Sequence, residues 1–341
     1  MSVQASSIAS FDTVYSADST EFCPFQDRAQ YLAVGTYQLT DEQRGNVRIR
    51  KGKTYLFDVT KPLVPKQVIE TPAVLDMKWS HSLVNDKQCL GIVDSVGGFH
   101  LYGFDEEDKL TLVDHTQATE DASVLCLSLD WASRLDKSDK RIVTSHSNGD
   151  INILSPDDSG GYAIKDQWHA HDAEVWIAAF DYWNTNIVYS GADDGLFKGW
   201  DARTQTPTFT YKQHMMGVTT MQSNPHKEHQ LATGNYDETI YFWDTRSTRQ
   251  PVSTFKTPGG GIWRLKWHPT RANRLLSASM HAGAFVVEID DQCEAHMLTS
   301  FLDHTSMTYG ADWSFSEPDL VASCSFYDHI MHLWKTSTPN Q

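Results

Sequence analysis

The sequence predicts an all-β protein, a seven-bladed β-propeller in which seven four-stranded sheets stand around one axis. Two observations predict it. One motif recurs every 43 to 50 residues along the chain, and short β-branched and aromatic runs alternate with Gly, Asn and Asp turns. A repeat of this length is typical of propellers, in which each copy supplies one sheet. We therefore expect residues 1–341 to form one ring and a single domain.

The motif is clearest in three segments that align without gaps. They are SGADDGLFKGWD (190–201), TGNYDETIYFWD (233–244) and CSFYDHIMHLWK (324–335), and each places a Trp six residues after an Asp. Weaker copies fit the same frame, so that the chain has seven anchor positions: Phe57, Phe104, Leu154, Trp200, Trp243, Val287 and Trp334. Their spacings of 47, 50, 46, 43, 44 and 47 residues predict seven blades.

Each unit reads as four short strands, and a WD-like dipeptide ends the third strand. In this the chain resembles WD-repeat proteins. The last anchor, Trp334, lies too near the end of the sequence for a fourth strand to follow it. Residues 8–16 (IASFDTVYS) have strand-like content and precede the inner strand of the first blade. We expect them to complete the seventh sheet and close the ring, which removes an open sheet edge.

Composition limits the partners. The net charge of −16 would repel a phosphate backbone, so no direct nucleic-acid partner is expected. No apolar run reaches the roughly 18 residues of a membrane span, and no signal peptide is apparent, so no membrane association is expected. Five widely spaced cysteines lack metal-ligand spacing and indicate reduced thiols. We expect a cytoplasmic monomer without a metal or cofactor.

Three blades contain the ingredients of a Ser-His-Asp triad. In each, a His lies 29 or 30 residues before the anchor Trp, with a hydroxyl on the second strand and an Asp in the turn that follows. Three copies of one catalytic triad would be unusual. WD-repeat proteins use the same set as a buried hydrogen-bond chain, and we expect that role for three sets: His171, Ser190 and Asp194; His214, Thr233 and Asp237; His304, Ser323 and Asp328.

Blade 6 departs from this pattern. His281 stands where the other blades have the turn Asp, and the blade is entered through Pro258 and three glycines, 259–261. Inner strands and their entry loops line the channel of a propeller and its top face, the face at which those strands begin. We expect seven residues of blades 4 to 7 to surround a cavity there: Glu174, Trp176, Asp193, Tyr236, Trp263, Tyr309 and Tyr327. Their aromatic faces favour a cation or an imidazole, although such residues also form ordinary protein-binding rims.

The second half of the chain resembles one particular family. The strings HDAEVWIAAF, GGGIWRLKWHP, SASMHAGAF, YGADWS and CSFYDHIMHLW occur in order between residues 168 and 335 and are similar to those of the diphthine methyl ester hydrolases of diphthamide biosynthesis. The resemblance implies removal of a methyl ester from a modified histidine on translation elongation factor 2. It also implies a substrate side chain that carries a trimethylammonium group.

Ester hydrolysis requires an attacking oxygen, a base and donors for the oxyanion. Our hypothesis is that His281 is the base, that Arg264 or a backbone N–H of the 259–261 turn holds the oxyanion, and that Glu174, Asp193 and Trp263 hold the cation. The alternative is a non-enzymatic adaptor that binds a protein partner on the top face, which the absence of a recognised hydrolase motif favours.

Overall fold

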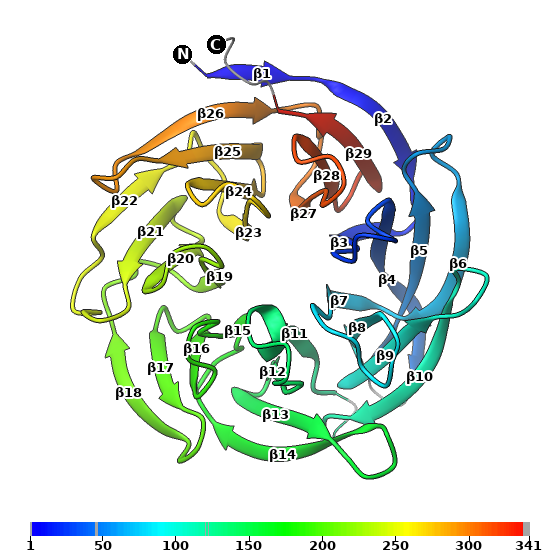
Figure 1. Ribbon diagram of the computed structural model, residues 1–341, viewed down its shortest axis with the longest axis horizontal. Helices are drawn as coiled ribbons and strands as arrows, with labels where there is room; N and C mark the ends of the chain where they lie inside the picture. The colour runs from blue at the N-terminus through cyan, green and yellow to red at the C-terminus, as the bar shows by residue number, and fades with distance from the viewer. Residues whose placement is uncertain (1, 45–46, 120, 122, 337–341) are drawn as a thin grey trace.

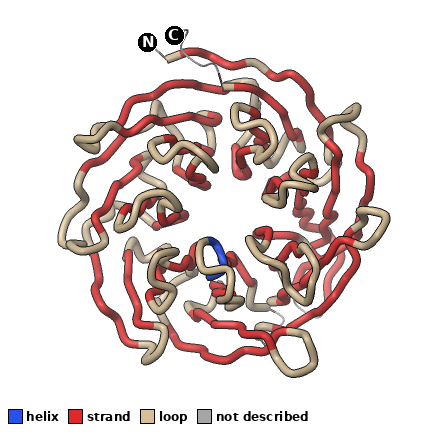
Figure 2. Tube along the Cα trace, viewed as in Figure 1, coloured by secondary structure: helices blue, strands red, loops and turns tan. Residues whose placement is uncertain are grey.

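The computed structural model describes residues 2–44, 47–119, 121 and 123–336. Seven antiparallel sheets stand radially around a central channel (Figure 1), which confirms the predicted seven-bladed propeller. Nearly all of the regular structure is strand (Figure 2), and the one helical element of the described residues is the 3-10 turn η1 (Ala132–Arg134). Within the same ranges, no helix is long and apolar enough to cross a membrane.

The strands of each blade follow one another along the chain from the channel outwards. Blade 1 contains β3 (Ser16–Phe22), β4 (Tyr31–Arg44), β5 (Val47–Asp58) and β6 (Pro65–Pro72), and blade 2 contains β7 (Val74–Trp79), β8 (Cys89–Asp94), β9 (Gly98–Phe104) and β10 (Leu110–Gln117). Blade 3 contains β11 (Cys126–Trp131), β12 (Ile142–His146), β13 (Asp150–Pro156) and β14 (Tyr162–His169). Blade 4 contains β15 (Ile177–Phe180), β16 (Ile187–Gly191), β17 (Phe197–Asp201) and β18 (Thr206–Tyr211).

The remaining blades repeat this order. Blade 5 contains β19 (Val218–Ser223), β20 (Gln230–Asn235), β21 (Thr239–Asp244) and β22 (Ser253–Lys256). Blade 6 contains β23 (Ile262–Trp267), β24 (Arg274–Ser279), β25 (Gly283–Ile289) and β26 (Ala295–Phe301). Blade 7 contains β27 (Thr308–Trp313), β28 (Leu320–Ser325) and β29 (Ile330–Lys335).

The N-terminal segment closes the ring. Strand β2 (Ser7–Asp12) pairs antiparallel with β29 and forms the outer strand of blade 7. It is shorter than the predicted 8–16, because Val14 has a positive φ of 67° in a turn and Ser16 already begins β3. Strand β1 (Val3–Ala5) pairs parallel with β26 and adds a fifth strand to blade 6. Three residues carry too little periodicity for the sequence to have predicted it.

The anchor positions lie on the third strands. Trp200 faces Val188 of the second strand, and the same register recurs in the other blades apart from blade 2. There the residue in register is Tyr102, opposite Leu90, and the predicted anchor Phe104 lies two residues later. Both side chains are buried on the same face of the strand, because alternation has a period of two, so the sequence pattern alone could not separate them.

The predicted hydrogen-bond chain is complete in blade 4. His171 Nδ1 lies 2.9 Å from Asp194 Oδ2, its Nε2 lies 2.8 Å from Ser190 Oγ, and Trp200 Nε1 donates to the same hydroxyl at 2.8 Å. Blade 7 uses one more link. His304 contacts Ser323 Oγ at 2.7 Å and Ser325 Oγ at 2.8 Å, and Ser325 then donates to Asp328. These groups are structural, as expected.

In blade 5 the expected chain is broken. His214 Nδ1 lies 3.0 Å from Asn235 Nδ2, and its Nε2 finds no partner among the described residues. Asp237 instead accepts from the hydroxyl of Tyr241 at 3.1 Å, and the ring of Tyr241 packs 4.4 Å from the imidazole. The prediction for His214, Thr233 and Asp237 was therefore wrong as a single chain. A bulky neighbour takes the carboxylate that the imidazole would otherwise bind.

A second set of tryptophans joins neighbouring blades. Each ends an inner strand and donates its indole N–H to a backbone carbonyl of the preceding blade, at 2.9 to 3.1 Å. The four pairs are Trp79 with Glu21, Trp131 with Lys78, Trp267 with Gln222 and Trp313 with Lys266. These bonds fix the inner strands relative to one another, and therefore fix the side chains that face the channel.

Candidate active site at the top of the channel

The inner strands share an irregularity near their first residues, at the top face. Six of them carry a register shift of the β-bulge type, which leaves one residue outside the ladder of paired residues. In blade 4, Trp176 lies directly before β15 and takes the equivalent place. Each blade thus supplies one such residue, and we call the set the bulge ring: Asp18, Leu75, Leu127, Trp176, Thr219, Trp263 and Tyr309.

The bulge ring surrounds a small cavity at the top of the channel. Six of its members line the cavity together with Arg264, the residue that follows Trp263. The seventh member, Tyr309, stacks on Trp263 with 4.7 Å between ring centroids and 27° between planes. The cavity is therefore aromatic on the side of blades 4, 6 and 7.

Further rings extend this aromatic surface across the top face. Trp176 lies 5.5 Å and Tyr236 6.1 Å from Trp263, measured between ring centroids. Tyr309 continues to Phe326 at 5.2 Å, and Phe326 to Tyr327 at 5.0 Å. The five aromatic residues expected at this site thus form one series of neighbouring rings, linked through Phe326. Of the seven residues expected to surround a cavity, however, only Trp176 and Trp263 line it.

Two carboxylates lie beside these rings. Trp176 donates its indole N–H to Asp193 Oδ1 at 3.1 Å, and the backbone N–H of Asp193 donates to the carbonyl of Glu174 at 3.0 Å. Burial, assisted by the negative charges of Asp193 and Glu174, raises the pKa of Tyr236. Both carboxylates are exposed, as predicted for a rim. Acids beside aromatic faces favour a cation at this place.

The two expected catalytic residues lie in different surroundings. Arg264 is buried, and its Nη1 lies 3.0 Å from Asp76 Oδ1. Burial opposes its charge, but the carboxylates of Asp76, Glu21 and Asp18 outweigh that effect and raise its pKa. His281 is exposed on the turn of blade 6 and does not line the cavity. Its backbone lies against Gly260, which has a φ of +72° and no room for a side chain.

One cavity residue escaped the sequence analysis. Asp18 is 5% exposed, and its Oδ1 has no hydrogen-bond partner in the described part of the chain. Burial raises the pKa of Asp18 to about 7, with Arg264 acting against this shift and Asp76 adding to it. The strand that contains Asp18, SADSTEF, has no tryptophan, and its first residue, Ser16, falls within the predicted closing strand 8–16. No sequence signal marked it.

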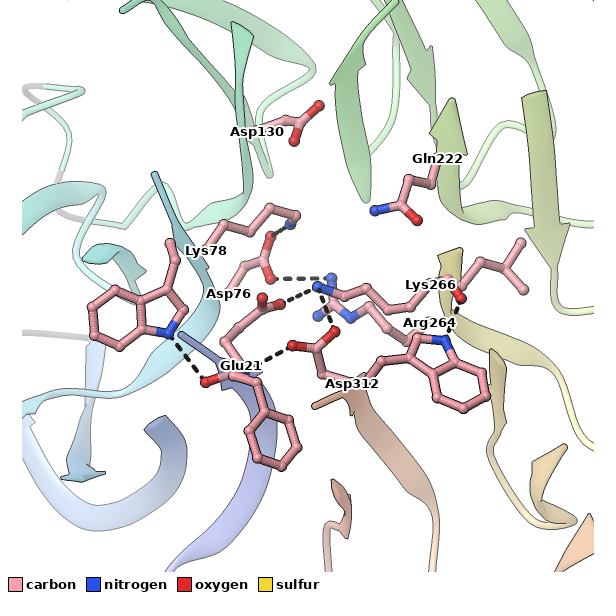
Figure 3. Close-up of polar contacts among 12 residues, drawn as sticks. Glu21, Asp76, Lys78, Asp130, Gln222, Arg264, Lys266 and Asp312 are labelled. Carbon is pink, nitrogen blue, oxygen red and sulfur yellow. Dashed lines mark hydrogen bonds and ion pairs between the residues drawn. The ribbon is translucent and has the colours of Figure 1, made fainter. Parts of the chain in front are cut away.

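A polar layer lies deeper in the channel, beneath the cavity (Figure 3). The third residue after the bulge position is charged or amidic in six blades: Glu21, Lys78, Asp130, Gln222, Lys266 and Asp312. Lys266 forms ion pairs with Glu21 and, at 3.9 Å, with Asp312. Asp130 accepts a backbone N–H from Phe180 at 3.0 Å, and burial raises its pKa to about 6. All six of these residues also line a second cavity, which lies towards the bottom of the ring.

Among the positions that the structure describes, no three His, Cys, Asp or Glu side chains are placed to hold a metal ion. All five cysteines are free thiols, and four of them are buried.

Comparison with known proteins places the chain in a family. The WD domain, G-beta repeat model matches residues 205–244. The diphthine methyltransferases of mouse and human are both 40% identical to this chain over 89% of it, covering 68% and 74% of those proteins. The diphthine methyltransferase homolog of Dictyostelium discoideum is 34% identical, over 94% of this chain and 96% of its own. The chain belongs to the diphthine methyltransferase family.

The family name differs from the resemblance seen in the sequence. Diphthine methyltransferase names methyl transfer, whereas the resemblance implied hydrolysis of a methyl ester. Both names refer to diphthine and its methyl groups. Among solved structures, one chain of the crystal structure of the mitotic checkpoint complex superimposes with a TM-score of 0.75 at 18% identity, over 98% of this chain and 93% of that one. This likeness supports the propeller fold alone.

Proposed function

We propose that the protein acts in diphthamide biosynthesis as a methyl ester hydrolase, and that its substrate is methylated diphthine on translation elongation factor 2. The single observation that carries this proposal is the cavity of the bulge ring. There Trp176 and Trp263 line a cavity together with the buried Arg264, and Tyr309 stacks on Trp263. We call these three rings the aromatic cage; the carboxylate of Asp193 bonds to Trp176 beside it. A cage of this kind suits a quaternary ammonium group, and a fixed guanidinium suits the oxyanion of ester hydrolysis.

The cage supplies binding of the cation. A quaternary ammonium cannot donate hydrogen bonds, so it is held by aromatic faces and by diffuse negative charge, at about 0.5 to 2 kcal/mol per ring. Trp176, Trp263 and Tyr309 offer the faces, while Asp193 and Glu174 offer the charge. Because the cavity is small, the substrate side chain must project from its protein to reach it.

The top face also carries exposed apolar side chains around the opening of the cavity, which we call the mouth. Met215 and Met216, in the entry loop of blade 5, are 81% and 52% exposed, and Tyr327 is 65% exposed. Exposed methionines adapt to many partner shapes. They support docking of a protein substrate, and they would equally support the adaptor alternative, which the experiment below separates from catalysis.

Methyl transfer is the second candidate, because the relatives' name states it. It would require a methyl donor such as S-adenosylmethionine. Glycine-rich turns that hold nucleotide cofactors commonly lead into a helix N-terminus. Here the 259–261 turn leads directly into strand β23, and η1 is a turn of three residues. The residues therefore do not fit that type of cofactor site, and the hydrolase is favoured.

The proposal includes a cytoplasmic, monomeric protein. Free thiols at all five cysteines suit a reducing compartment. The net charge of −16 suits a substrate with a fixed positive charge and disfavours nucleic acid.

The test is incubation of the purified protein with methylated elongation factor 2, followed by mass spectrometry of the modified peptide. Hydrolysis removes one methylene mass from methylated diphthine. Methyl transfer adds one to unmethylated diphthine when S-adenosylmethionine is present. If the substrate binds but its mass changes in neither assay, the adaptor reading replaces the proposal.

A further inference from the structure

Asp18 is the acidic member of the bulge ring and lines the cavity. We propose that Asp18 is the general base that activates the attacking water, with Arg264 as the oxyanion donor. This inference rests on the proposed ester hydrolysis and gives it a residue that neither the sequence motifs nor the family name assigns.

The geometry singles out this carboxylate. Asp18 is 5% exposed and lines the same cavity as Trp176, Trp263 and Arg264. Its Oδ1 is buried without a hydrogen-bond partner among the described residues. A buried polar atom without a partner costs about 1 to 3 kcal/mol, and native folds rarely retain such a cost. Because Oδ1 is closed to solvent, a water or substrate atom in the cavity would be bound by the other carboxylate oxygen, Oδ2.

The other buried acids of the channel are already engaged. Asp76 is paired with Arg264 and accepts a backbone N–H from Leu129 at 3.1 Å. Glu21 and Asp312 share Lys266. Asp130 accepts two donors and lies in the deeper polar layer. The described channel residues therefore leave Asp18 as the carboxylate that is both unbonded and in contact with the cavity.

The surroundings of Asp18 suit a base at neutral pH. The charged and titratable groups that face it are Arg264 on β23, Asp76 on β7, Tyr309 on β27 and Cys324 on β28. Burial is the largest influence and raises its pKa to about 7, while Arg264 prevents a larger rise. A general base works best when its pKa lies near the working pH.

The reaction then balances in two steps. In the first, the Asp18 carboxylate takes a proton from water as the water oxygen bonds to the ester carbonyl carbon, and the carbonyl π electrons move to the oxygen beside Arg264. In the second, the oxyanion re-forms the carbonyl and the bond to the methoxy oxygen breaks. The leaving methoxy group takes the proton from Asp18, which releases methanol. The product is a carboxylic acid, which loses its remaining proton to solvent, and repulsion between that carboxylate and the ionised Asp18 favours release.

His281 is the rival base from the sequence analysis. It is exposed on the rim, does not line the cavity, and has no hydrogen-bond partner within the described chain that would orient it. A base must come within hydrogen-bond reach of the water that it activates. The enclosed carboxylate meets this requirement from its position, whereas the exposed imidazole would have to enter the mouth.

The decisive experiment compares Asp18→Asn, His281→Ala and Asp158→Asn in hydrolysis of methylated elongation factor 2. Asp158 lies exposed in a turn on the outer side of blade 3 and is the matched control for loss of a carboxylate. We expect Asp18→Asn to lower kcat by about 100-fold or more, with little change in binding of the methylated protein. We expect Asp158→Asn to match wild type.

The pH profile separates a catalytic role from a structural one. In wild type, kcat/KM should rise with pH through an inflection near 7, and the residual activity of Asp18→Asn should lack that inflection. This inference is overturned if wild type is active and Asp18→Asn keeps the wild-type rate and the inflection near pH 7. It is also overturned if His281→Ala is the only variant that loses the rate and the inflection. If wild type itself hydrolyses no ester, the proposed function fails instead.

Discussion

Trp263 and Tyr309 stack with ring centroids 4.7 Å apart, although they belong to different blades. Each is the bulge residue of its inner strand, so the same irregularity in neighbouring sheets places both rings at the channel mouth. The cage is therefore a product of how the blades are arranged, and no single blade contains it.

The first prediction concerns this cage. Trp263→Ala should raise KM for a substrate with a trimethylammonium group by about 5- to 30-fold, because it removes one cation–π contact of about 1 to 2 kcal/mol. A substrate analogue without the positive charge should lose much less. Steady-state kinetics with both substrates measure the difference. Trp183→Ala is the control, since Trp183 is 44% exposed and lies beyond the ends of the inner strands, on the bottom face. Equal losses for both substrates would contradict the cage.

The second prediction compares two histidines in equivalent places. His171 bonds through both ring nitrogens, whereas His214 bonds through one and packs against aromatic rings. His171→Phe should therefore lower the free energy of unfolding by about 2 kcal/mol more than His214→Phe, because it leaves Asp194 and Ser190 without their shared partner. Urea denaturation measures both values. Similar losses would mean that the hydrogen-bond chain of blade 4 adds nothing beyond packing.

The third prediction is a pH dependence of stability. The pKa of Asp18 is about 7 in the folded protein against 3.8 as its ordinary value, so the folded state binds more protons between these limits. Wild type should lose stability as pH rises through that window, because the unfolded chain releases the proton that the buried carboxyl group of the folded protein keeps. Asp18→Asn removes this effect. The unfolding free energy of the variant minus that of wild type should therefore increase from pH 4 to pH 7 and then stay level. A difference in unfolding free energy that is independent of pH would argue against a raised pKa of Asp18.

The fourth prediction concerns ring closure. Deletion of residues 2–12 removes β2, exposes the edge of β29 and removes Phe11, which packs 5.0 Å from Phe57 between ring centroids. We expect a lower melting temperature and association through the open edge. Deletion of residues 2–5 removes β1 alone and should have a smaller effect. Thermal unfolding and light scattering after size-exclusion chromatography report both changes.

Much of the fold was predictable because each blade repeats a pattern of its own. A turn Asp followed by an anchor aromatic, as in Asp194 and Trp200, identifies one hairpin without reference to the rest of the chain. Phe104 was placed two residues from the true anchor position, because its blade has neither the Trp nor the turn partner that fixes the frame. The three residues of β1 leave no pattern at all.

The site was predictable in part, for the same reason. Trp176, Trp263 and Tyr309 were found because entry positions of inner strands face the channel in any propeller. Asp18 was not found, since its orientation depends on a register shift between β3 and β4 that no hydrophobic period encodes. The sequence pattern pointed to His281 because no structural role accounted for it. Whether such a residue lines the cavity depends on how the turn folds, and the turn of blade 6 leaves His281 outside the cavity lining.

The register shift near the start of six inner strands also bears on which residues of the protein can be exchanged. A residue that stands outside the ladder is not needed for the pairing of its sheet, so it can be exchanged while the blade stays intact. The seven positions of the bulge ring, one per blade, hold an acid at one, a threonine at one, leucines at two and aromatic rings at three. A library of variants restricted to these positions would therefore change the lining of the channel mouth while leaving the strand pairing of the blades in place.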